Sequence, residues 1–120
     1  MITHVSKAIM YVADQDRSLD FYVHRLGFEK IVDEEMWPGA RWVELRPPSA
    51  QTSIVLSAAE QFDKTPGEGA YLTFACDDIH DTVKQLRAAG VEVTDPVKEP
   101  WGTYIKATDP DGHGFQISEQ

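Results

Sequence analysis

The 120-residue sequence has one cysteine, few basic residues and no long apolar run. A single cysteine, Cys76, cannot form an intrachain disulfide, and its position in the apolar run YLTFAC predicts a small buried thiol. No segment approaches the roughly 18 apolar residues of a membrane-spanning helix. Acidic residues follow the first residues too closely for a signal peptide. We therefore expect a cytoplasmic protein that does not insert into a membrane.

The scarcity of basic residues excludes another class of partner. Lysine and arginine number 11, aspartate and glutamate number 20, and the formal net charge is −9. Nucleic-acid binding needs clustered lysine and arginine, whereas here they are scattered along the chain. An apolar fraction of 42% and a charged fraction of 26% are typical of soluble globular proteins. We expect a single domain, residues 1–120, that does not bind nucleic acid.

An internal repeat is the most informative feature. The segments VADQDRSLDFYVHRLGFEKI and FACDDIHDTVKQLRAAGVEV each predict a strand end, a turn, a helix, a glycine stop and a new strand. Asp14 precedes Gly27 by 13 residues, and Asp77 precedes Gly90 by the same interval of 13. The sequence therefore predicts two equivalent halves.

Each half is predicted to contain one amphipathic helix. Apolar residues recur every three or four positions across residues 17–26 and 79–89, as in a helix with one buried face. A carboxylate at the start accepts hydrogen bonds from the free amides of the first turn, and glycine suits the left-handed position after the last turn. The predicted caps and stops are Asp16 and Gly27 for the first helix, and Asp78 and Gly90 for the second.

One strand is predicted before each helix and three after it. The predicted strands are residues 6–12, 29–35, 40–47 and 52–58 in the first half, and 70–76, 91–97, 101–109 and 114–119 in the second. The prediction is an α+β fold of two tandem βαβββ modules, residues 4–57 and 70–118, joined by a linker at 58–69. One helix covers only one face of each sheet, so the mixed sheet is expected to curl its other face around a concave cleft.

The duplicated unit, the helix DRSLDFYVHRLGF and the closing turn DPDGHGFQI together resemble the vicinal oxygen chelate superfamily, which includes glyoxalase I, extradiol dioxygenases, fosfomycin-resistance enzymes and bleomycin-resistance proteins. The resemblance extends from about Val5 to Ser118. It implies a cup that a second subunit commonly completes, and therefore a homodimer. In metal-using members it also implies a divalent metal held by four His, Glu or Gln side chains.

The four ligand positions that the resemblance implies are Lys7, Val55, Tyr71 and Gln116 in this sequence. A protonated lysine has no lone pair for a metal, and valine has no donor atom. The phenol of Tyr71 is protonated at neutral pH, so only the amide oxygen of Gln116 could coordinate an ion. We therefore predict no metal and no other cofactor.

The four histidines do not repair this deficit. His4 lies three residues from Lys7, so strand alternation turns it to the other face. His24 and His80 lie on the predicted helices and His113 lies in the closing turn. Each is predicted to be a plain surface histidine, and the closing turn is predicted to be a hairpin without a metal.

Strand alternation predicts an aromatic inner face with a few charges. Lys7 is expected to form a structural ion pair with Glu44, although it could instead bind a carboxylate or polarise a carbonyl, and Glu44 could act as a general acid or base. The tryptophans suit either stacking on a planar or cationic molecule or packing in a dimer interface. The predicted ligand-contacting residues are Lys7, Trp37, Trp42, Glu44, Val55, Tyr71, Trp101, Tyr104 and Gln116. Ile9, Tyr11, Thr73 and Lys106 are expected on the same face, above a core of Val43, Leu45, Ile54, Leu56, Leu72, Phe74, Ile105, Phe115 and Ile117.

Three functions remain open on the sequence alone. The favoured one is a metal-free, dimeric protein that binds and sequesters an aromatic or cationic small molecule, similar to bleomycin-resistance proteins. The second is a metal-dependent enzyme, either a glyoxalase-like lyase or isomerase or a dioxygenase relative. The third is a subunit or regulatory domain without a ligand. Fold resemblance alone does not decide among them.

Overall fold

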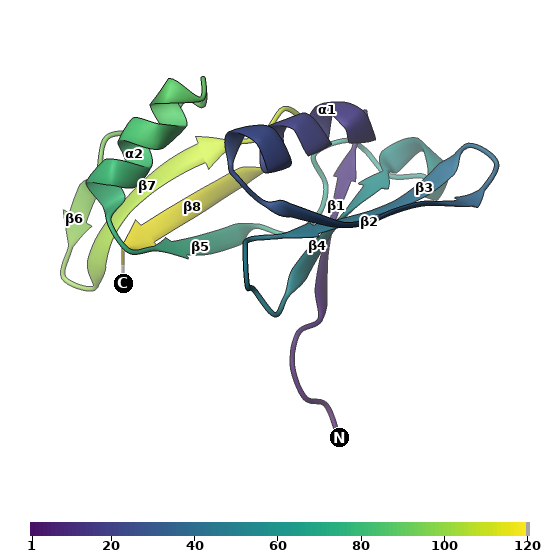
Figure 1. Cartoon of the computed structure of the whole chain (residues 1–120), viewed down its shortest axis with the longest axis horizontal. Coiled ribbons are helices and arrows are strands. Elements are labelled where there is room, and N and C mark those ends of the chain that lie inside the picture. Colours follow the sequence, from purple (N-terminus) through teal and green to yellow (C-terminus); the bar gives the residue numbers. More distant parts are fainter. Residues whose placement is uncertain (120) are drawn as a thin grey trace. The chain divides into compact units, whose positions relative to one another are not determined.

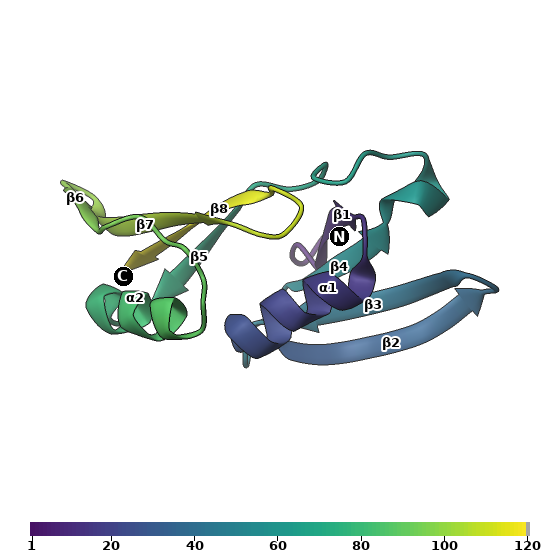
Figure 2. The ribbon, with the colours of Figure 1, turned by 90° about the horizontal axis from the view of Figure 1, so that it is seen from above.

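The computed structural model describes residues 1–119, which form two compact units, residues 1–70 and a second unit from Tyr71 onward. Each unit consists of one four-stranded mixed sheet with a helix along one of its faces (Figure 1). Figure 2 shows the same layering within each unit from above, with α1 and α2 each lying along its own sheet. The predicted α+β class is confirmed.

The first unit has the strand order β1-β4-β3-β2, in which β1 and β4 are parallel and the other neighbours are antiparallel. Three short helical segments accompany this sheet within residues 1–70. Its elements are β1 (Lys7–Val12), α1 (Gln15–Leu19), the π-helical η1 (Asp20–Arg25), β2 (Glu29–Trp37), β3 (Ala40–Arg46), β4 (Ser53–Ala58) and the 3-10 helix η2 (Ala59–Phe62).

The second unit repeats this arrangement with the strand order β5-β8-β7-β6, again with its first pair of neighbours parallel. Its elements are β5 (Leu72–Cys76), α2 (Ile79–Ala88), β6 (Val97–Glu99), β7 (Gly102–Thr108) and β8 (Gly114–Glu119). The identical strand orders confirm the internal repeat that the spacing of aspartate and glycine predicts. Among the described residues, no helix is long and apolar enough to cross a membrane.

The core of each unit lies between its sheet and its helix. Every second residue of a strand points to the helix, because side chains alternate between the two faces of a sheet. Seven of the nine predicted core residues are at most 7% exposed. Leu72 and Phe74 of β5 are only partly buried. The buried seven are Val43, Leu45, Ile54 and Leu56 in the first unit, and Ile105, Phe115 and Ile117 in the second.

The first helix begins two residues earlier than predicted. The side chain of Asp14 accepts hydrogen bonds from the backbone N–H groups of Asp16 and Arg17, at 2.9 and 3.1 Å, so Asp14 is the N-cap. The prediction of Asp16 is therefore wrong, because both aspartates suit a cap and only the earlier one has extended backbone geometry. After Leu19 the helix widens into η1, where the N–H of Leu26 bonds the carbonyl of Phe21 five residues back.

The second helix follows its prediction closely. Asp78 is the N-cap, and its carboxylate accepts from the N–H of Asp81 at 3.1 Å. Gly27 and Gly90, the predicted stops, both have φ of +81°, the left-handed geometry that ends a helix without strain only at glycine.

The strand predicted at residues 91–97 is wrong for most of its length. β6 contains only Val97–Glu99, and before it a single bridge joins Val93 to Ala107 of β7. The cause is Thr94, whose hydroxyl oxygen accepts the N–H of Lys106 at 2.8 Å and replaces the carbonyl that a ladder would use. Pro96 has no N–H to continue the pairing.

The outer edge of β1 is closed by residues 67–70. The N–H of Tyr11 donates to the carbonyl of Glu68 at 2.9 Å, and the N–H of Gly67 donates to the carbonyl of Tyr11 at 3.0 Å. Gly69 lies against Met10 in an isolated antiparallel bridge, with φ of +132°. This segment therefore continues the sheet beyond β1 by backbone contacts alone.

The opposite edge of the first sheet is β2, which has nine residues. Its pairing with β3 slips between Lys30 and Val32 and again between Glu35 and Trp37. Such bulges twist a strand and interrupt its ladder. The long edge strand is therefore irregular at both ends.

Candidate functional site

We define the helix-free face of the first sheet as the face opposite α1, and it holds the predicted charged and aromatic residues of that unit. Lys7 pairs with Ser53 across β1 and β4, and Glu44 pairs with Val55 across β3 and β4. These residues alternate with the buried core positions, so they share the other face. Its members are Lys7, Ile9, Tyr11, Trp42, Glu44, Ser53 and Val55.

The carboxylate of Glu44 is the centre of this face. Its Oε1 accepts the indole N–H of Trp42 at 3.0 Å. Its Oε2 accepts the Lys7 ammonium at 3.1 Å and the hydroxyl of Ser53 at 2.6 Å. The side chain of Glu44 is 10% exposed, whereas that of Lys7 is 42% exposed. The predicted structural ion pair is confirmed, and Glu44 has two further donors that keep it anionic.

The electrostatics of Glu44 follow from these contacts. Burial alone raises the pKa of this carboxyl, but the hydrogen bonds from Ser53, Trp42 and Lys7 outweigh burial, and the pKa lies below its usual value of 4.5. Both oxygens are engaged and the group is charged at neutral pH. Glu44 is therefore better suited to fixing the Trp42 ring and the Lys7 ammonium than to proton transfer.

Replacing Glu44 with glutamine is expected to lower the free energy of unfolding by about 1–3 kcal/mol near neutral pH. Because the pKa of Glu44 is lowered in the folded state, the stabilisation by its ionised carboxylate is complete above about pH 4.5. It is lost as the pH falls through the folded-state pKa. The difference between wild type and Glu44→Gln should therefore shrink on acidification. Urea unfolding of both proteins at about pH 7 and about pH 3 measures it; a constant difference would contradict this assignment. The lowered pKa of Asp33 beside Arg41 acts in both proteins alike and cancels.

The metal-ligand positions that the resemblance implies do not form a donor set. Lys7 presents an ammonium that is already paired with Glu44. Val55 is 1% exposed and has no donor atom. In the second unit, Tyr71 lies before β5 rather than on it, and its ring lies about 3.5 Å from the position a Cβ would take at Gly114. Only Gln116, on β8, offers a suitable oxygen, so these residues do not fit a divalent metal.

An aromatic cluster borders the first sheet. Phe62 of η2 lies 6.4 Å from the ring of Tyr11 and 6.4 Å from the ring of Trp37, measured between centroids. The ammonium of Lys64 lies 5.6 Å from the Tyr11 ring. Trp37 is 48% exposed and Phe62 is 39% exposed. The sequence analysis named Trp37 and Tyr11 as candidates but not Phe62 and Lys64, since the linker has no period that predicts where its side chains point.

The helix-free face of the second sheet, opposite α2, holds a second group of aromatic and basic residues. Trp101 stacks on Tyr104 with centroids 5.3 Å apart and planes 16° apart. The Lys106 ammonium lies 5.9 Å from the centroid of the Tyr104 ring. Lys106 pairs with Gln116, which in turn pairs with Thr73 of β5. The unit thus presents an aromatic stack beside a row of polar side chains.

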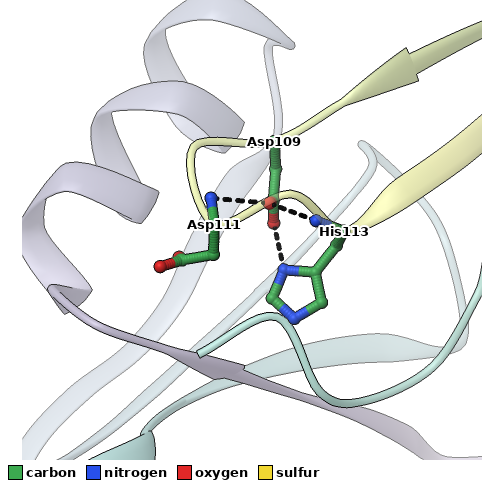
Figure 3. Close-up of side chains that lie close together, drawn as sticks. All are labelled: Asp109, Asp111 and His113. Atoms are coloured by element: carbon green, nitrogen blue, oxygen red, sulfur yellow. Dashed lines mark hydrogen bonds and ion pairs between the residues drawn. The ribbon is translucent and has the colours of Figure 1, made fainter. Parts of the chain in front are cut away.

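The closing turn holds a buried pair that the sequence did not predict (Figure 3). His113 Nδ1 lies 2.6 Å from Asp109 Oδ2, and the two side chains are 1% and 0% exposed. Asp109 Oδ1 also accepts the backbone N–H groups of Asp111 and His113, each at 2.9 Å. The prediction of a surface histidine is wrong for His113, because the tight turn folds its ring onto Asp109. His4, His24 and His80 are exposed, as predicted.

Asp109, Asp111 and His113 place three possible ligand atoms within 4.8 Å of one another. The contacts of Asp109 account for the geometry without an ion: one oxygen contacts the imidazole and the other accepts two amides. We therefore interpret the group as a brace of the β7–β8 turn. Cys76, predicted to be buried, is a free thiol of intermediate exposure.

Comparison with known proteins identifies relatives along the whole length. The chain is 31% identical to the uncharacterized protein YetH of Bacillus subtilis (strain 168), over 99% of this chain and 100% of YetH. The crystal structure of a member of the Glyoxalase/bleomycin resistance protein/dioxygenase superfamily from Sphaerobacter thermophilus DSM 20745 is similar, with a TM-score of 0.89 and 36% sequence identity. The match covers 100% of this chain and 99% of that chain. The antibiotic binding protein TnmS3 from Streptomyces sp. CB03234 has a TM-score of 0.86 and 31% identity, covering 98% and 96%.

A family model matches residues 2–117, nearly the whole chain. The match includes both repeated units, their helices and the closing turn. Together with the duplicated strand order and the similar solved structures, it shows that this chain belongs to the Glyoxalase/Bleomycin resistance protein/Dioxygenase superfamily.

Proposed function

We propose that this chain is a metal-free small-molecule-binding protein, active as a homodimer, that sequesters its ligand rather than transforming it. The helix-free face of each sheet, considered by itself, offers contacts for a ligand. The observation that carries the proposal is the bond between Lys7 and Glu44, because it places a paired ammonium where the superfamily resemblance implies a metal ligand.

The surrounding residues are suited to binding. Both oxygens of the Glu44 carboxylate are hydrogen-bonded, and the indole N–H of Trp42 is one of the donors. These side chains are therefore already ordered, and ligand binding costs little further side-chain entropy. Exposed rings give large flat contact areas for planar molecules. The similar TnmS3 protein is described as antibiotic binding, which supports a small-molecule ligand here.

The homodimer is the second element of the proposal. Trp37 and Trp101 are 48% and 62% exposed, and tryptophan is enriched in interfaces between subunits as well as in ligand sites. A second copy could cover some of this apolar surface while other rings remain for the ligand. The alternative function, a metal-dependent glyoxalase-like or dioxygenase-related enzyme, needs donor atoms that Lys7 and Val55 do not supply.

Native mass spectrometry of the tag-free protein tests both elements in one experiment. The protein is incubated with nickel, zinc, iron and manganese ions, desalted, and its mass compared with that of the untreated sample. We expect two chains and much less than one metal ion per chain. About one ion per chain, lost on Gln116→Ala, would support the enzymatic alternative and direct work to glyoxalase and dioxygenase assays; a monomer would remove the dimer from the proposal.

A further inference from the structure

We propose that the ligand is a planar aromatic molecule with an anionic oxygen group, and that Lys106 binds this group while Trp101 and Tyr104 stack on the rings. This inference rests on the proposed binding function and specifies its ligand class. The overall negative charge of the chain favours a cationic ligand. We infer an anionic ligand instead, because the local charge on the helix-free face of the second sheet is positive at Lys106.

The two lysines on the helix-free faces differ in one respect. Lys7 is paired with Glu44 at 3.1 Å, so its charge is compensated within the protein. Lys106 is exposed, and within residues 1–119 no carboxylate forms an ion pair with it. Its ammonium lies over the face of the Tyr104 ring, 5.9 Å from the centroid. Lys106 is therefore the uncompensated cation on these faces.

The neighbours of Lys106 favour an oxygen-rich group on the ligand. Gln116 lies directly across β8 from Lys106, and Thr73 lies across β5 from Gln116. An amide and a hydroxyl one strand apart can both donate to acceptor oxygens beside the ammonium. Glu99 of β6 pairs with Gly102, so it lies at the other end of the hairpin from Lys106. Glu92 lines a pocket together with Lys106, but within residues 1–119 the two side chains form no ion pair.

The aromatic stack supplies the planar part of the site. Trp101 and Tyr104 are nearly parallel, at 16°, and Trp101 is 62% exposed, so the indole presents a free surface to a further flat ring. Val97 pairs with Tyr104 and is 40% exposed, which adds apolar area at the edge of the stack.

Three probes with one ring system and different charge test this inference: 2-naphthoate, the neutral 2-naphthalenemethanol and the cationic 2-naphthylmethylamine. Their affinities for the full-length protein are measured by ligand-observed NMR titration. We expect wild type to bind naphthoate about tenfold more tightly than the alcohol, and the amine most weakly. Lys106→Met should remove the tenfold preference for naphthoate over the alcohol. Trp101→Ala should weaken naphthoate and alcohol alike.

Lys98→Met is the matched control. Lys98 pairs with Thr103 and so points to the opposite face of the same hairpin, while its loss changes the net charge by the same amount. We expect Lys98→Met to bind all three probes as wild type does. Equal effects of the two lysine variants, or equal binding of the three probes, would overturn the inference and leave the binding function intact. If no probe binds and a broad thermal-shift screen yields no ligand, both the inference and the proposed function fail.

Discussion

Replacing Asp109 with alanine is expected to lower the free energy of unfolding by about 3–5 kcal/mol. Asp109 is completely buried and accepts from two backbone amides while it contacts the imidazole of His113. Its removal takes this partner from two buried groups, the N–H and the imidazole of His113, and from the partly buried N–H of Asp111. Chemical denaturation with intrinsic fluorescence measures the loss.

Asp111→Ala is the matched control for this prediction. Asp111 lies in the same turn, but its contact with Asp109 uses its backbone N–H, which alanine retains. We expect a change within about 1 kcal/mol. Equal losses for the two aspartates would show that the turn depends on local charge rather than on the buried contacts of Asp109. A loss below 1 kcal/mol for Asp109→Ala would contradict the brace outright.

Gly69→Ala is expected to lower the free energy of unfolding by at least about 3 kcal/mol. A Cβ at this position would lie 2.6 Å from the carbonyl oxygen of Ile9 and 2.9 Å from the Cα of Met10, and neither backbone atom can move independently of β1. The φ of +132° is itself costly for any residue with a Cβ. The change should separate residues 67–70 from β1, which faster amide exchange of Tyr11 would report.

Gly27→Ala separates backbone strain from steric conflict. Gly27 also has a positive φ, of +81°, but a Cβ there meets nothing within 4 Å. We expect a loss of about 1 kcal/mol, with the exchange of Tyr11 unchanged. If Gly69→Ala costs no more than Gly27→Ala, the close approach to β1 does not limit the stability of the first unit.

The sequence was sufficient where local chemistry and periodicity agree. The Asp–Gly interval predicted both helical segments, and alternation placed Lys7 and Glu44 together because a strand has only two faces. The substitution of the expected metal donors could also be read from residue types alone. Ser53, the third donor to Glu44, could also have been predicted, since it precedes Val55 by two residues and therefore lies on the same face of β4.

Other features depended on contacts that no local pattern encodes. The burial of His113 follows from the tight turn around Asp109, and an imidazole in a polar turn is equally compatible with exposure. The shortness of β6 follows from the hydroxyl of Thr94 competing for a ladder donor. The packing of Phe62 against Trp37 joins the linker to the end of β2, a pairing set by tertiary structure.

The irregular pairing of β2 has a consequence for assembly. A nine-residue edge strand presents unpaired backbone groups that could template pairing with another chain. Its register slips near each end, and its sequence carries charged side chains on both faces; these are Glu29, Lys30, Asp33, Glu34 and Glu35. Both features discourage edge-to-edge addition and fibre growth. A second copy, as proposed above, would therefore associate through side chains rather than by extending this sheet.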